Sequence, residues 1–175
     1  LVLDNHPMDE KIYRKELFSS EMLLLAVPKS AKIPSALQKF ALEHHDVLEG
    51  RQLLTQTYAV NIRDFMQNSF IALRHGNDTR IRMDMICEQS GFSPKIQLEV
   101  DQLTTAYNIV CSNMGITLVS DTLITHTAPV PGVVYYKLDS EQLYRHSYFY
   151  YKNSSYVTRA MREFIRTGTS SFARS

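Results

Sequence analysis

The sequence predicts an α/β fold in which helices cover both faces of a sheet. Short apolar runs of strand length alternate with helical patterns between Pro28 and Thr127, which makes right-handed βαβ units the default arrangement. The run that ends at Val27 is continuously apolar, as is typical of a strand buried on both faces. With 175 residues, 44% of them hydrophobic, the chain has enough material for one large domain or two lobes.

The first part of the chain contains two predicted strands and one predicted helix. Residues 1–4 form an apolar run whose natural place is a buried strand, and residues 21–27 form the second strand. A helix is predicted over 35–45, because Ser35 and Gln38 have the spacing of a capping box. Residues 46–60 have no clean periodicity and are predicted to be a loop with a short helical turn.

The middle of the chain has the clearest alternation of strands and helices. Its predicted elements are a short helix at 61–66, a strand at 70–73, a helix at 78–91, a strand at 95–100 and a helix at 101–115. Either Asn77 or Asp78 is placed to cap the second of these helices, which Gly91 ends. Asp101 is placed to cap the third, whose apolar residues form a single stripe that ends at Gly115.

The last part of the chain is predicted to return to strands. The predicted elements are a strand at 116–119, a helix at 120–126, strands at 133–138 and 147–152, and a final helix. Ser154 or Ser155 is expected to cap this final helix and Gly168 to end it, which leaves 169–175 as a polar tail. Residues 28–130 are predicted to form one lobe, and 1–27 together with 131–168 the other.

Composition excludes several classes of protein. The chain has 19 Lys and Arg against 18 Asp and Glu, a net charge of +1, which is far from the basic excess of a self-sufficient nucleic-acid binder. Two cysteines without a partner pattern argue against a disulfide framework and favour a reducing compartment. No apolar run approaches the length that crosses a bilayer, and the start is not a signal peptide, so a cytoplasmic location is expected.

Catalytic and metal-binding motifs are missing from the sequence. There is no G-x-S-x-G, no Walker loop and no H-E-x-x-H, so the chain is predicted not to be an enzyme and to use no cofactor. His44 and His45 are adjacent, and neighbouring side chains on a helix point about 100° apart, so they do not suit one metal ion. No metal site is therefore predicted.

Taken in order, several stretches resemble the effector-binding domain of LysR-type bacterial transcription regulators. These stretches are 1–4, the crossover at 13–28, the residues Phe70, Ile71, Arg80, Asp84, Gly91, Phe92 and Pro94, the helix and strand at 100–120, and the closing strands and helix at 134–164. The resemblance covers nearly the whole chain, and its specificity comes from the order of the motifs. Residues 29–60 depart from the family pattern because they are longer than the usual link, and Ser120 stands where a proline is common.

The resemblance implies a two-lobed periplasmic-binding-protein-like (type 2) fold, with mixed sheets flanked by helices. Residues 1–27 and 131–168 would be an incomplete regulatory lobe I, and 28–130 regulatory lobe II. The family's DNA-binding helix-turn-helix, its linker helix, and the first strand and helix of the sensing domain are expected upstream of Leu1. The implied partners are a small-molecule effector, a second copy or a tetramer, and DNA only through the missing N-terminal domain, with no membrane.

The candidate effector site follows from the crevice at the carboxyl ends of strands, where helix N-termini present free N–H groups. Two loops qualify there, at 74–79 and at 101–104, and the opening segment is expected to face them from the other lobe. The candidate residues are Asn5, His6, Arg74, His75, Asn77, Asp78, Thr79, Asp101, Gln102, Leu103 and Thr104. Such donors suit a small polar or anionic effector.

Simpler interpretations of these residues stay open. Arg74 is equally well explained as a solvent-facing loop charge and His75 as a satisfied turn residue, whereas Asp78 and Asp101 fit a plain capping role better than ligand contact. A solute-binding protein of a transport system would have the same two-lobed architecture, but it would require export. An upstream helix-turn-helix distinguishes a regulator from such a receptor.

Overall fold

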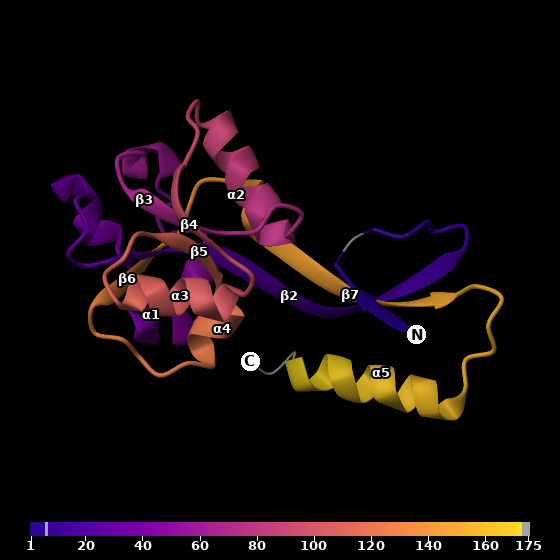
Figure 1. The fold of residues 1–175 in the computed structure, drawn as a ribbon. Helices are drawn as coiled ribbons and strands as arrows, with labels where there is room; N and C mark the ends of the chain where they lie inside the picture. The colour runs from indigo at the N-terminus through magenta and orange to yellow at the C-terminus, as the bar shows by residue number, and fades with distance from the viewer. Residues whose placement is uncertain (6, 173–175) are drawn as a thin grey trace. The chain divides into compact units, whose positions relative to one another are not determined.

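The computed structural model describes residues 1–5 and 7–172, and the chain divides into two compact units (Figure 1). The first unit consists of Leu1–Glu21 and Tyr144–Ser175, and the second of Met22–Leu143. The predicted lobe boundaries lie after residues 27 and 130, whereas the two compact units divide after Glu21 and after Leu143. The assignment of these units as the two lobes of a sensor stays a prediction.

The second unit is built on mixed strand pairings, as expected for the predicted α/β fold. Strand β2 (Tyr13–Pro28) pairs antiparallel with β5 (Thr117–Ser120) on one side and with β6 (Val133–Tyr136) on the other. Strands β3 (Ser69–Leu73) and β4 (Lys95–Val100) are parallel to each other. A parallel bridge from Phe70 to Ile116 links β3 to the strand segment that leads into β5.

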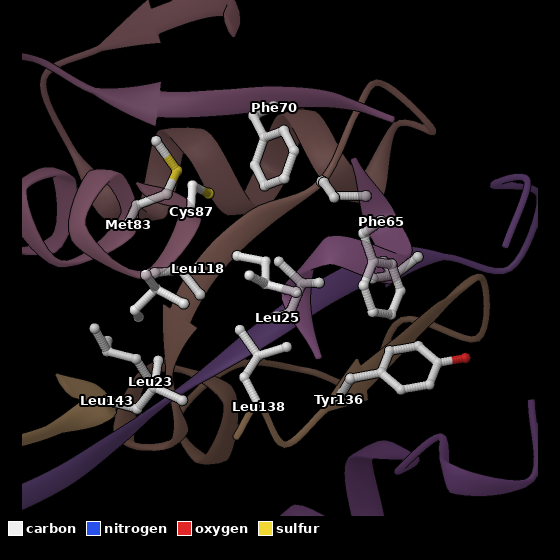
Figure 2. Close-up of a cluster of buried hydrophobic side chains, with 14 of the residues drawn as sticks. Leu23, Leu25, Phe65, Phe70, Met83, Cys87, Leu118, Tyr136, Leu138 and Leu143 are labelled. Carbon is white, nitrogen blue, oxygen red and sulfur yellow. The ribbon is translucent and has the colours of Figure 1, made fainter. Parts of the chain in front are cut away.

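The apolar run of β2 separates two hydrophobic clusters. Leu23, Leu25 and Val27 belong to one cluster, which Figure 2 shows, and Met22, Leu24 and Ala26 belong to the other. All six side chains are at most 1% exposed. Because successive side chains of a strand point to opposite faces, one continuous apolar run lines both clusters. The predicted two-sided burial of this strand is confirmed.

Helices cover both sides of these strands. Helices α1 (His44–Leu48), α3 (Leu103–Cys111) and α4 (Asp121–Thr125) supply the cluster of Met22, while α2 (Asp78–Gln89) supplies the cluster of Leu23 (Figure 1). Four short 3₁₀ helices complete the unit, at Ser35–Phe40, Arg51–Leu53, Ile62–Phe65 and Glu141–Leu143. None of the helices among the described residues combines the length and apolar character that crossing a membrane requires.

The first unit contains β1 (Val2–Asp4), β7 (Tyr144–Lys152), the first part of β2, and helix α5 (Arg159–Phe172). Strand β1 pairs antiparallel with β7, with Leu3 opposite Phe149, and β7 pairs with β2. Leu1, Val2 and Leu3 are 47–50% exposed. The prediction that the opening strand is buried was therefore wrong, because β1 is the edge strand of its sheet and pairs only with β7.

The predicted helix over 35–45 is another correction. A 3₁₀ helix covers Ser35–Phe40, and its N-cap residue is Pro34, so the predicted Ser35 capping box does not form. Leu42 leaves the helical path to make a two-way backbone bridge with Tyr135, at 2.8 and 2.9 Å. These tertiary hydrogen bonds satisfy the backbone of Leu42 outside a helix, and a new helix, α1, starts only at His44.

Helix α5 begins and ends later than predicted. The hydroxyl of Thr158, rather than Ser154 or Ser155, accepts a hydrogen bond from the backbone N–H of Met161 at 3.1 Å. Gly168 lies inside the helix instead of ending it. A Cβ at Gly168 would stand 3.2 Å from the ring of Phe149, so this glycine permits close packing of α5 on β7.

Candidate functional site

Parallel pairing of β3 with β4 brings the two predicted loops to the same edge. Leu73 is paired with Val100, and each is the last residue of its strand. The backbone N–H of Arg74 donates to the carbonyl of Val100 at 3.1 Å. The loops 74–79 and 101–104 therefore start from adjacent positions, as the carboxyl ends of parallel strands do.

An ion pair connects the two loops. Arg74 Nε lies 3.0 Å from Asp101 Oδ1, and both side chains are more than two-thirds exposed. The prediction that Asp101 caps helix α3 was wrong, because the N-cap residue is Gln102, whose side chain accepts no hydrogen bond from this helix end. The first backbone N–H groups of α3 are thus without a cap from the Gln102 side chain. Arg74 lies beside them, and its exposed ion pair with Asp101 is weak.

The start of helix α2 is capped within the loop itself. Asn77 is the N-cap residue, and its side-chain oxygen accepts a hydrogen bond from the backbone N–H of Thr79 at 2.9 Å. Asp78 is the first helical residue and accepts from Arg82 Nε at 2.8 Å. Of the two predicted caps, the structure has Asn77. Asp78 is engaged with Arg82, and Thr79 is only 5% exposed.

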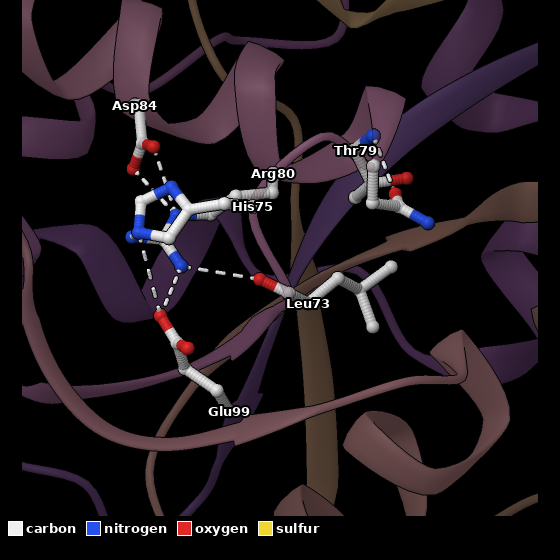
Figure 3. Close-up of polar contacts among 7 residues, drawn as sticks. Leu73, His75, Thr79, Arg80, Asp84 and Glu99 are labelled. Carbon is white, nitrogen blue, oxygen red and sulfur yellow. Dashed lines mark hydrogen bonds and ion pairs between the residues drawn. The ribbon is translucent and has the colours of Figure 1, made fainter.

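Arg80 lies on α2 and forms hydrogen bonds with residues of α2, β3 and β4 (Figure 3). Its Nε bonds both carboxylate oxygens of Asp84, at 3.0 and 2.8 Å, and its Nη1 donates to Glu99 at 2.6 Å and to the carbonyl of Leu73 at 3.1 Å. Burial disfavours the charged guanidinium, but the bonds to Glu99 and Asp84 outweigh it and raise the pKa of Arg80. Arg80 is therefore a fixed cation that ties α2 to β3 and β4.

His75 extends this network toward solvent (Figure 3). Its Nε2 lies 3.2 Å from Arg80 Nη2 and 3.8 Å from Glu99 Oε1. The hydrogen bond from Arg80 lowers the pKa of Glu99, with smaller contributions from the charges of Arg80, His75 and Arg74. His75 thus stands next to a carboxylate that stays ionised.

The remaining predicted residues differ in exposure. Gln102 and Thr104 are exposed at the start of α3, whereas Leu103 is half-buried against the cluster of Met22. Asn5 is half-buried in the other compact unit. His6 lies outside the described residues.

Sequence reasoning missed the supporting role of Arg80, Asp84 and Glu99. The signal was present in part, because Arg80 and Asp84 are four residues apart on one helix face. The contribution of Glu99 depends on the pairing of β4 with β3, which no local pattern reveals. Within 1–5 and 7–172, no group of three or more His, Cys, Asp or Glu side chains could hold a metal ion.

Comparison with known proteins identifies relatives of the sequence. The family model described as "LysR substrate binding domain" matches residues 1–172. The HTH-type transcriptional regulator CzcR of Bacillus subtilis (strain 168) is 30% identical over 139 residues, which are 78% of this chain and 48% of that protein. The chain therefore spans about half the length of the curated relatives it matches.

Solved structures show a similar fold at low sequence identity. The CcmR regulatory domain of Synechocystis PCC6803 in complex with 2-PG aligns with a TM-score of 0.70 at 13% identity, covering 97% of this chain and 72% of that one. The effector binding domain of QuiR in complex with shikimate aligns with a TM-score of 0.66 at 15% identity, covering 98% and 71%. These similarities confirm the predicted periplasmic-binding-protein-like fold.

Proposed function

The chain belongs to the LysR substrate binding domain family, and from that membership we propose that it senses a small polar or anionic effector and so controls DNA binding by a bacterial transcription regulator. The curated relatives carry names of HTH-type transcriptional regulators. Two proteins of similar fold are bound to 2-PG and to shikimate. The named relatives lend no support to the alternative of a transport receptor.

One observation carries the proposed ligand chemistry: Arg74 stands beside a helix N-terminus that has no side-chain cap. The pair of Arg74 with Asp101 joins the end of β3 to the residue just before the N-cap of α3. A helix N-terminus and a guanidinium both attract carboxylates and phosphates. An exposed ion pair contributes only about 0–1 kcal/mol, so an anionic effector is able to replace Asp101 as the partner of Arg74.

The other loop residues receive supporting roles in this proposal. The side chains of Gln102 and Thr104 supply exposed hydrogen-bonding groups at the start of α3, and His75 supplies a second nitrogen donor. Asp78 and Thr79 keep the loop in shape through their contacts at the start of α2. Asn5 and His6 remain proposed contacts from the opening segment.

We further propose that the whole protein works in the cytoplasm as a homodimer or tetramer, with DNA contacts made by a separate N-terminal domain. The near-neutral net charge of this chain agrees with DNA contacts made by a separate domain, because a DNA-binding surface requires a basic patch. In this arrangement the two units correspond to the two regulatory lobes.

The role of Arg74 is testable with an exposed arginine elsewhere as the matched control. A thermal-shift screen of carboxylic acids and phosphate esters identifies the effector, since a ligand at 100 times its Kd stabilises by about 2.7 kcal/mol. Arg74→Ala is then expected to weaken that binding about tenfold, because it removes a charge-assisted contact. Arg166→Ala, which breaks another exposed ion pair, should leave the affinity unchanged. Wild-type affinity in a folded Arg74→Ala protein would remove Arg74 from the site.

A further inference from the structure

A cavity of about 310 Å³ opens at the end of β2, within the second unit. Its walls come from the end of β2, from the segment 29–60 and from β6. The described lining includes none of the residues of the loops at 74–79 and 101–104. Its volume lies at the lower end of the range of small-molecule sites, which begins at about 300 Å³.

The hydroxyl of Tyr136 is a polar group at the cavity wall that makes no hydrogen bond to a described residue. Tyr136 is 1% exposed and lines the cavity, and its ring packs against Phe65 with centroids 5.1 Å apart. Figure 2 shows the hydroxyl directed away from the leucines of the core. Burial alone raises the pKa of Tyr136, so the hydroxyl stays a proton donor, whereas the neighbouring Tyr135 hydroxyl bonds that of Tyr107. The Tyr136 hydroxyl is therefore available to donate a hydrogen bond to a ligand in the cavity.

Two opposite charges stand on the same cavity wall. Lys29 Nζ lies 2.7 Å from Glu43 Oε1, and both side chains are a little under half exposed. Such a pair is weak, so each group is able to take another partner. A zwitterion fits both charges at once, with its carboxylate near Lys29 and its ammonium near Glu43.

Apolar side chains form most of the rest of the wall, to which Gln38 adds one polar side chain. Ile33 is half-buried and Val134 is buried, and both line the cavity. They offer a surface for a short aliphatic side chain, while the hydroxyl of Tyr136 donates to a ligand oxygen. We propose that this cavity is a second small-molecule site, distinct from the loop site, and that it takes an α-amino acid with a short apolar side chain.

Three related probes test the charge requirement in the full-length protein. L-leucine carries both charges, 4-methylpentanoate lacks the ammonium, and 3-methylbutylamine lacks the carboxylate. Isothermal titration calorimetry is expected to show binding of L-leucine, with each analogue about tenfold weaker. The proposal is overturned if L-leucine does not bind at about 10 mM, or if 4-methylpentanoate binds as tightly.

Variants then locate the binding. Tyr136→Phe removes only the unpartnered hydroxyl, so it should fold normally and bind L-leucine about fivefold more weakly. Lys29→Met, at an exposed position, should weaken binding about tenfold. Tyr156→Phe, which changes an 83% exposed tyrosine in the first unit, is the matched control and should bind as the wild type does.

Arg74→Ala separates this site from the proposed effector site. It should leave the affinity for L-leucine unchanged while it weakens the binding of the effector. A loss of L-leucine affinity in Arg74→Ala as large as in Lys29→Met would show that L-leucine occupies the loop site instead, and wild-type affinity in both Tyr136→Phe and Lys29→Met would place it outside the cavity. Either result overturns the proposal.

Discussion

Arg80 is a buried cation whose partners are half in solvent. The side chain of Arg80 is 8% exposed, whereas those of Asp84 and Glu99 are 40% exposed. The guanidinium joins α2 to the ends of β3 and β4, from which both loops of the candidate site emerge. These contacts fix the positions from which the two loops start.

Replacing Arg80 with methionine is expected to destabilise the protein by about 1–3 kcal/mol, because hydrogen bonds to two carboxylates and a buried carbonyl are lost. The cost stays below that of breaking a fully buried pair, since both carboxylates regain water. Urea denaturation measures the free energy of unfolding. Arg51→Met is the control, because Arg51 also pairs with two carboxylates, of Asp46 and Glu49, but is half exposed. Equal losses in both variants would contradict the importance of burial.

The roles of single residues in the candidate site could be predicted from the sequence only in part. Arg74 and Asp101 could be located because each follows a short strand, and parallel strands end at one edge. That Asp101 faces Arg74 instead of capping α3 depends on the register between β3 and β4, which is a tertiary property. The choice of Asn77 over Asp78 as the cap is equally hidden, because Asp78 has an alternative partner in Arg82.

Gly115 links α3 to β5 in a conformation that only glycine adopts easily. Its φ is +72°, and a Cβ there would stand 2.8 Å from the carbonyl oxygen of Ser69 and 3.1 Å from Cδ1 of Ile71. The same backbone angle occurs at Gly50, where a Cβ would meet nothing within 4 Å. Replacing each glycine therefore distinguishes two costs: backbone strain, which both positions share, and a steric clash, which of these two occurs only at Gly115.

Gly50→Ala is expected to cost about 1–2 kcal/mol, the penalty of a left-handed conformation in a residue with a Cβ. Gly115→Ala should cost about 1–3 kcal/mol more, because β3 must also move away from the new methyl group. Denaturation midpoints of the two folded variants measure the difference. Equal denaturation midpoints would mean that Ser69 and Ile71 in β3 move away from the new methyl group without a cost in the free energy of folding.

Elements were predictable where their own hydrogen bonds and periodicity decide the structure. The boundaries of β3, β4 and α2 are close to those expected, since strong local signals agree there. The prediction of a helix over 35–45 failed because the backbone of Leu42 forms hydrogen bonds with Tyr135, which is far along the chain. Gly168 was misleading for a related reason: a glycine near a helix end is typical of a terminator, yet here it serves the contact of α5 with Phe149.

The two units differ in how much core each contains. Both hydrophobic clusters lie wholly within Met22–Leu143. Among the described residues of the first unit, the buried hydrophobic side chains are those of Phe149, Tyr150 and Ile165. The first unit also joins two segments that are distant in sequence, so its folding requires their association.

A fragment of residues 22–143 is therefore expected to fold alone, with one cooperative thermal transition and a native-like near-ultraviolet circular dichroism spectrum. A chain that joins residues 1–21 directly to 144–175 is the comparison, and it should lack a cooperative transition because it buries too little apolar surface. A molten 22–143 fragment, without fixed tertiary signals, would show that the second unit depends on the first.

At the scale of the whole molecule, the α/β class followed from the alternation of elements, and the two-lobed fold from the order of the family motifs. The compact units were harder to delimit from sequence. The boundary within β2 lies inside one continuous strand, after Glu21, where no glycine or proline marks it.

The division of β2 between two clusters also governs which changes in chain length the fold can survive. Deleting one residue between Met22 and Val27 would reverse the side chains on one side of the gap and send them to the wrong cluster. The same deletion at 54–57, outside any helix or strand, only shortens a surface connection. Insertions and deletions among descendants of this sequence should therefore accumulate in the segment 29–60 and spare the six residues that serve both sides of the sheet.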